Sequence, residues 1–260
     1  MGKILTIAGL VLGVVLTFGQ ACSKAGLKSK TYDLSSATST APPAEAAATC
    51  NTPPGFSGSP KTIVEAIDMI NALPKPVTVG CFLQSLKRPL NVTLTSSVRS
   101  MQPAYSPQSP RIFILINDFT VSVVPEGDGS KVIEFSELTP PATTLKGELA
   151  FPVPAAISHS AAYDRILFGT TGTTCQFCHS QETHADDIAF ANAFRSSALQ
   201  PQADTIVSLD SLKTEWTNCN SIAQPDRCAI LEGLFGHGEV DSTSMPTAYP
   251  FFNLGGNQPN

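Results

Sequence analysis

Two cysteines and a histidine stand close together at Cys175, Cys178 and His179, in the stretch TCQFCH. Thiols three residues apart can add to two vinyl groups on one edge of a porphyrin, and a histidine directly after the second thiol can ligate the iron. The spacing therefore predicts one covalently bound haem c. Cys175 and Cys178 would form the thioethers, and His179 would be the proximal ligand.

Three other interpretations of this cysteine pair stay open. A zinc site would need a second pair of ligands, and Cys219 and Cys228 lack the CxxC spacing. A thioredoxin-like redox pair should lie between a strand and a helix of a βαβ unit, which the flanking sequence does not predict. The third interpretation is a structural disulfide that happens to precede a histidine.

The first 21 residues are typical of an export signal. Lys3 is followed by an uncharged apolar run over residues 4–18. This run is shorter than the roughly 20 residues that span a bilayer, but it suits the core of a signal peptide. A plain signal peptidase site after Ala21 fits the small residues there. The stretch also resembles a bacterial lipoprotein signal, which implies lipidation of Cys22 and anchoring in the cell envelope, facing the periplasm or the cell surface.

The seven cysteines are consistent with this assignment. An exported protein meets an oxidising compartment, where disulfides form. If two cysteines bind haem and one carries lipid, four remain, and four cysteines allow three pairings. The sequence-local pairing joins Cys50 to Cys81 and Cys219 to Cys228.

Charge and composition indicate the nature of the remaining segments of the chain. The net charge is −5 and no basic run is present, so we expect no nucleic-acid partner. Residues 22–58 are rich in Ser, Thr, Ala and Pro, which predicts a flexible tether. Residues 59–154 form the next part, whose role the sequence does not indicate.

Within residues 59–154 the pattern predicts a helix and then strands. Ser59 and Pro60 suit a helix start, and Pro74 suits its end. Alternation of period two over residues 91–95, 111–124, 131–135 and 145–153 predicts strands, with a hairpin turn at 126–129. We therefore expect an α+β fold in which one helix and a small antiparallel sheet or sandwich precede a mainly α-helical part.

That mainly helical part is predicted over residues 155–260. Helices are expected at 158–168, 185–199, 204–216 and 225–236, around the CxxCH stretch. With Met245-Pro246 towards the end, this part resembles a monohaem c-type cytochrome. The resemblance implies a domain over residues 155–260 in which a methionine is the distal iron ligand. The stretch between Cys219 and Cys228 departs from the family pattern.

Candidate distal ligands differ in how well they could reach the iron. Met245 leads, because a thioether favours the ferrous state. His237 is the alternative, since flanking glycines would let its loop approach the iron. His184 is too near His179 along the chain to reach the opposite haem face easily, and His159 lies just before the motif.

The expected function is one-electron transfer by an exported, lipid-anchored cytochrome with an unidentified redox partner protein. Two alternatives remain. One is a haem enzyme with an open distal site, similar to a peroxidase or oxidase. The other is a haem-free envelope lipoprotein that acts as a binding module. A single haem motif disfavours a dihaem peroxidase mechanism within one chain, and we expect an electron carrier rather than an enzyme.

Overall fold

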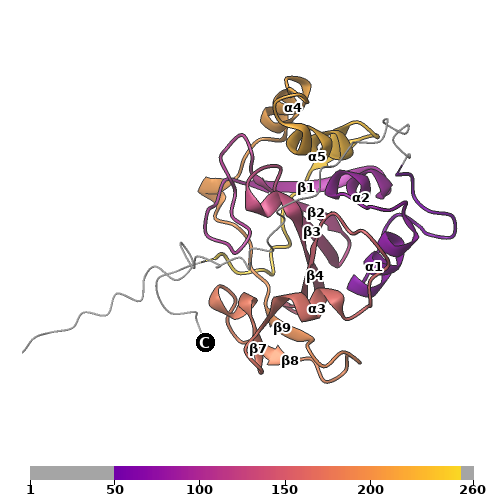
Figure 1. The fold of residues 1–260 in the computed structure, drawn as a ribbon. Helices are drawn as coiled ribbons and strands as arrows, with labels where there is room; N and C mark the ends of the chain where they lie inside the picture. Colours follow the sequence, from indigo (N-terminus) through magenta and orange to yellow (C-terminus); the bar gives the residue numbers. More distant parts are fainter. Residues whose placement is uncertain (1–49, 253–260) are drawn as a thin grey trace, which may run out of the picture.

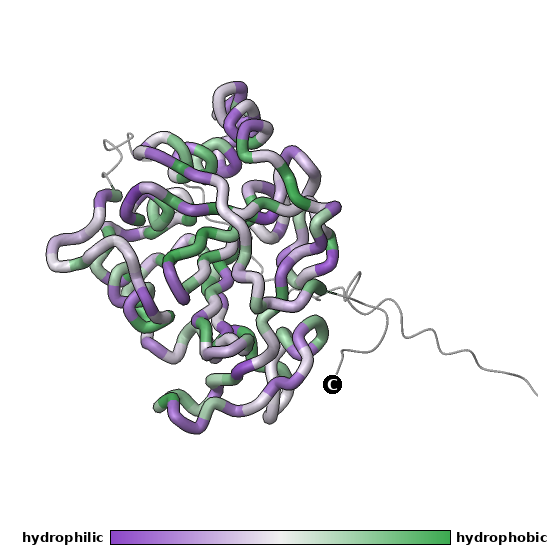
Figure 2. The backbone as a smooth tube through the Cα atoms, turned by 180° about the vertical axis from the view of Figure 1, so that it is seen from behind, coloured by the Kyte–Doolittle hydropathy of each residue, from purple (hydrophilic) through white to green (hydrophobic). Residues whose placement is uncertain are grey.

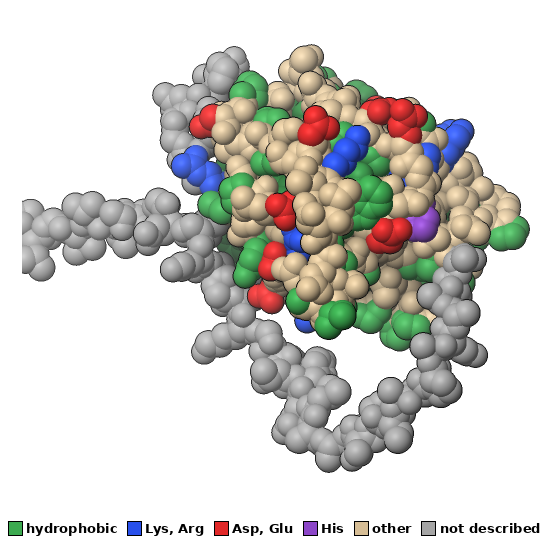
Figure 3. Space-filling view, turned by 90° about the horizontal axis from the view of Figure 1, so that it is seen from above, with side chains coloured by type: hydrophobic (Ala, Val, Ile, Leu, Met, Phe, Trp, Pro, Cys, Tyr) green, Lys and Arg blue, Asp and Glu red, His purple; other side chains and the backbone are tan. Residues whose placement is uncertain are grey.

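The computed structural model describes residues 50–252 (Figure 1). The predicted signal peptide over 1–21, the lipidation site Cys22 and the tether up to residue 49 lie outside the described residues. Among residues 50–252, no helix is long and apolar enough to cross a membrane. The face in Figure 3 carries isolated acidic and basic side chains among uncharged ones.

One large, mostly antiparallel sheet is the centre of the fold, with strand order β10-β1-β2-β3-β4-β5-β9-β8. Consecutive strands β1 to β5 form an antiparallel meander, and β10 adds in parallel beside β1. A separate two-stranded sheet pairs β6 with β7. The strands are β1 Leu90–Thr95, β2 Arg111–Ile116, β3 Phe119–Val123, β4 Val132–Thr139, β5 Thr143–Ala150, β6 Leu167–Phe168, β7 Gly172–Thr173, β8 Thr183–His184, β9 Phe194–Ser197 and β10 Val240–Ser242.

Within residues 50–252, five α-helices and three short 3₁₀ helices accompany the sheet. In Figure 1, α1 and α2 lie near the strands of the meander, while α4 and α5 lie together at one end of the molecule. The helices are α1 Ile63–Ala72, α2 Val79–Ser85, α3 Ala161–Ile166, α4 Leu209–Thr217, α5 Pro225–Phe235, η1 Asp128–Lys131, η2 Thr174–Phe177 and η3 Ala203–Thr205.

The two faces of the sheet differ in chemistry because successive strand residues point to opposite sides. On one face, Ile114, Val121 and Phe135 are almost fully buried and join the hydrophobic core with the helices. Figure 2 shows the central strands as largely hydrophobic, with hydrophilic stretches mostly in the loops around them. The other face carries the alternate residues, many of them polar: Arg111, Phe113, Thr120, Ser122, Glu134, Ser136, Thr144 and Lys146. We call this side the polar face.

The α+β class agrees with the structure, but a mainly helical part over residues 155–260 is not confirmed. Strands β8, β9 and β10 come from this part and join the same sheet as β1 to β5. The helix expected at 185–199 is wrong. Residues 194–197 instead form β9, in which Arg195 pairs with Leu145 of β5 and Phe194 is buried. Tertiary pairing has overridden local helix propensity here.

Several element boundaries also differ from expectation. Helix α1 is capped by Thr62, whose hydroxyl accepts a hydrogen bond from the Glu65 amide, rather than by Ser59. The apolar run 111–124 is two strands, because Asn117 adopts a left-handed conformation (φ 54°) and turns the chain between β2 and β3. Helix α2 had no counterpart in the predicted elements.

Other expected elements are present. Helix α5 begins at Pro225 and is followed by Gly236 at its C-terminal cap, as predicted. Two disulfides join the sequence-local pairs, Cys50 with Cys81 and Cys219 with Cys228. The first attaches the start of the described chain to α2, and the second attaches the segment after α4 to α5.

Packing of α2 against α5 generates a stability prediction. A Cβ atom added at Gly233 would lie 2.8 Å from the Cα atom of Gly80, too close for an unstrained contact. We expect Gly233→Ala to lower the free energy of unfolding by about 1–3 kcal/mol, measured by chemical denaturation. Ala229→Ser, at an exposed position of the same helix, should change it by less than about 0.5 kcal/mol. Equal effects of the two substitutions would contradict this account.

Candidate functional site

The CxxCH stretch is held as a compact turn directly after β7. The backbone amide of His179 donates to the carbonyl of Cys175 over 2.8 Å. The amide of Cys175 donates to the hydroxyl of Thr173 over 3.1 Å. The Glu182 carboxylate in turn accepts hydrogen bonds from the Thr173 amide at 2.7 Å and from the Thr173 hydroxyl at 2.5 Å. These bonds fix the backbone that carries the two cysteines and the histidine.

His179 is oriented by strand β9. Its Nδ1 atom lies 2.7 Å from the carbonyl oxygen of Ser197. A carbonyl can only accept, so Nδ1 carries the proton and Nε2 keeps its lone pair. Burial, followed by the charge of Lys146, holds the pKa of His179 well below its usual value, so the ring is neutral at pH 7. A neutral imidazole with one nitrogen held by a carbonyl is the usual state of a metal-ligating histidine.

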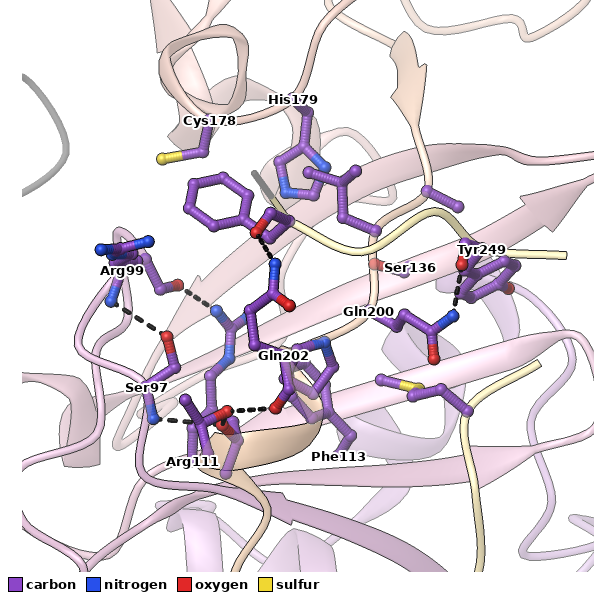
Figure 4. Close-up of a pocket in the computed structure, with 18 of the residues that line it drawn as sticks. Ser97, Arg99, Arg111, Phe113, Ser136, Cys178, His179, Gln200, Gln202 and Tyr249 are labelled. Carbon is purple, nitrogen blue, oxygen red and sulfur yellow. Dashed lines mark hydrogen bonds between the residues drawn. The ribbon is translucent and has the colours of Figure 1, made fainter. Parts of the chain in front are cut away.

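Cys175, Cys178 and His179 line a cavity of about 350 Å³ (Figure 4). Its floor is the polar face of the sheet. Its other walls come from three segments far apart in the sequence: residues 95–101 after β1, residues 198–205 after β9, and residues 245–252 near the C-terminus. In Figure 4, His179 and Cys178 come from one side of the cavity, across from Arg111 and Phe113. The volume lies within the usual range of sites for small molecules and cofactors, about 300–1,000 Å³.

Of the two basic side chains on the cavity floor, only Arg111 forms an ion pair with a carboxylate among the described residues. Arg111 pairs with Glu134 at 2.5 Å, and its Nε donates to Ser122 at 2.7 Å. Lys146 is buried, and the loss of hydration lowers its pKa to about 8. The floor of the cavity thus carries two basic side chains, Arg111 and Lys146, and one carboxylate, that of Glu134.

Among the predicted distal ligands, the structure brings Met245 into the same cavity as His179. Met245 is 7 % exposed and lines the wall formed by residues 245–252. His237 is exposed and does not line the cavity. His184 is exposed and hydrogen-bonded to Asp186.

The fourth predicted distal candidate, His159, is also placed elsewhere. It is exposed and lies 2.7 Å from Asp68, close to the start of α3 and not at the cavity. The sequence analysis did not identify most of the lining residues, among them Met101 and Lys146. A signal for Lys146 was present: a charged residue stands between Leu145 and Gly147, inside an otherwise buried strand.

The chemistry of Cys175 differs from that of a redox-active thiol. Burial raises the pKa of Cys175 from 9.0 to about 11, whereas reactive cysteines have lowered pKa values.

Cys219 and Cys228, which a zinc site would need as its second pair, are joined in a disulfide. Within residues 50–252, no group of three or more His, Cys, Asp or Glu side chains could hold a metal ion.

Comparisons of the chain with protein-family models, curated proteins and solved structures found no match. The roles of the residues in this cavity therefore follow from their chemistry and arrangement alone.

The raised pKa of Cys175 predicts slow alkylation of the folded, haem-free protein. At pH 8 the thiolate fraction should be about 100-fold lower than in the unfolded chain, because each pKa unit is a tenfold change. Iodoacetamide labelling of Cys175, followed by peptide mass spectrometry with and without urea, measures the ratio. The chain would carry Cys22→Ser and Cys178→Ser, so that no disulfide removes the Cys175 thiol. Faster labelling of the folded protein would instead favour a redox thiol.

Proposed function

We propose that this protein is a c-type cytochrome that carries one covalent haem and transfers single electrons. The observation that supports this most is the shared cavity. The CxxCH turn presents His179 to it with Nε2 unprotonated, and Met245 lines the same space. An attachment motif, a proximal ligand held for metal binding and a candidate thioether ligand thus meet at one cavity.

The residues present fit a haem. Cys175 and Cys178 would hold it by thioethers, and His179 and Met245 would be the ligands of its iron. The haem supplies one-electron redox chemistry when bound. The protein contributes the orientation and the surroundings of the haem. The Ser197 carbonyl orients the imidazole, and the cavity lining would determine how far the haem is buried, two features that tune a reduction potential.

The cytochrome-like part in this proposal is larger than residues 155–260. The floor of the cavity consists of β2, β3, β4 and β5, which belong to the sequence region 59–154. That region would therefore supply part of the haem pocket.

The proposal also places the protein in the bacterial cell envelope. An export signal over residues 1–21 and lipid on Cys22 would anchor it in a membrane, facing the periplasm or the cell surface. The compartment agrees with the disulfides Cys50–Cys81 and Cys219–Cys228, since disulfides persist in oxidising environments. Its electron donor and acceptor would be proteins of that compartment.

A second candidate function, an enzyme with an open iron site, is favoured by one observation. Arg99 lines the cavity, and its guanidinium could donate hydrogen bonds to a ligand of the iron. The spin state of the wild-type protein separates the two functions. A six-coordinate, low-spin iron supports the electron carrier, and a five-coordinate, high-spin iron supports the enzyme.

Attachment of haem can be tested directly. The chain is produced in a periplasm with haem c maturation machinery, and haem on the polypeptide is detected after denaturing electrophoresis. We expect covalent haem on the wild-type chain and none on the Cys175→Ser, Cys178→Ser double variant. A wild-type chain without haem under these conditions would refute the cytochrome proposal and favour a haem-free binding lipoprotein.

Substitution of Met245 tests the distal ligand. We expect Met245→Ala to retain covalent haem but to become high-spin, with a fall in reduction potential of at least about 59 mV, a tenfold change in a one-electron equilibrium. Met101→Ala is the matched control, because Met101 lines the same cavity from the β1–β2 connection. It should stay low-spin. The reverse result, with only Met101→Ala losing the low-spin spectrum, would assign the ligand to Met101.

A further inference from the structure

Strand β5 presents two polar groups to the cavity that lack good partners. The hydroxyl of Thr144 is buried and forms no hydrogen bond within the described chain. Lys146 is 9 % exposed, and its Nζ has only a long contact of 3.4 Å, to the Ser136 hydroxyl. Both residues point to the polar face, two positions apart on one strand, and both line the cavity. We call Thr144 and Lys146 the β5 donor pair.

Arg111, on the same face of the sheet, differs from Lys146 because its guanidinium has an acidic partner and hydrogen-bond acceptors. Its guanidinium pairs with Glu134 and also donates to the hydroxyls of Ser122 and Ser100. Lys146 has no carboxylate within ion-pair distance among residues 50–252. A buried ammonium without a counter-charge is costly, so such a group normally has an anionic partner.

The two donors of the β5 donor pair suit a carboxylate ligand. One ammonium and one hydroxyl can both donate to the two oxygens of a carboxylate. The charges of the cavity lining agree, because three cationic side chains (Arg99, Arg111 and Lys146) face only two acidic ones (Glu134 and Asp204). A ligand that brings negative charge would balance the site.

The position of Lys146 relative to the CxxCH turn indicates where that carboxylate comes from. Lys146 lines the same cavity as Cys175, Cys178 and His179, so its ammonium and the attachment turn face one common space. A haem bound there carries two propionate carboxylates into the same cavity. Resting on the proposed function, we infer that the β5 donor pair is the binding site for a haem propionate, so that the sheet binds the cofactor that the CxxCH turn attaches.

Variants of Lys146 test this inference through the reduction potential. Removing the cation would leave a propionate charge uncompensated and favour the ferric state. We therefore expect Lys146→Met to lower the potential by about 59 mV or more, which is a tenfold change in the one-electron equilibrium. Lys146→Arg keeps the charge and should stay within about a third of that shift.

Lys131→Met is the matched control, because Lys131 is an exposed lysine at the end of η1 and does not line the cavity. Its potential should equal that of the wild type. Equal potentials for Lys146→Met and Lys131→Met would overturn the inference. If the wild-type chain carries no covalent haem, the proposed function fails instead, so the two failures are distinguishable.

A measurement without any variant covers the case in which Lys146→Met does not fold or load haem. The crystal structure of the haem-bound wild type, grown without carboxylate buffers, should place Nζ of Lys146 within about 3.2 Å of a propionate oxygen. Contact of Nζ with the iron, with a solvent anion, or with no part of the haem would each overturn the inference.

Discussion

The pairing of β9 with β5 is the constraint on which the site depends. It places Ser197 opposite Thr143 at the edge of the meander. From there the Ser197 amide donates to the Ser180 carbonyl at 2.9 Å, and the Ser197 carbonyl accepts from His179 at 2.7 Å. One residue of β9 thus binds the histidine of the CxxCH turn and the backbone of the residue that follows it. Without this strand the histidine would have no fixed ring orientation and the cavity would lose a wall.

The strict alternation of the meander explains why a cavity can exist next to a stable core. Residues such as Ile112, Val121 and Phe135 bury one face completely. Their sequence neighbours are then forced to the opposite face, where polar side chains such as Arg111 and Glu134 need partners. Neighbouring residues of one strand therefore serve different purposes: one packs in the core, and the next faces the cavity. Burial of the apolar face stabilises the fold, while the polar face is available for a ligand.

Parts of this arrangement were predictable from the sequence, because their causes are local. The CxxCH spacing, Pro225 at the start of α5 and the alternation in β1 to β5 all act over a few residues. The region 185–199 was misjudged for the opposite reason. Its apolar spacing suits a helix, but Arg195 pairs with Leu145 of β5, some 50 residues earlier in the chain. Asp187, which lies in the first turn of the helix predicted over 185–199, instead pairs with Arg195 at 2.5 Å.

The site followed the same division. Local spacing made Cys175, Cys178 and His179 candidates, while the tertiary structure brings Met245 and Lys146 to the cavity that these three residues line. The two sequence regions first distinguished, 59–154 and 155–260, thus contribute opposite walls of one cavity and strands of one sheet. A ligand attached to the CxxCH turn and bound by the polar face would contact both regions at once. Because the contacts of such a ligand with the polar face form only in the folded chain, they would add to the stability of both regions together.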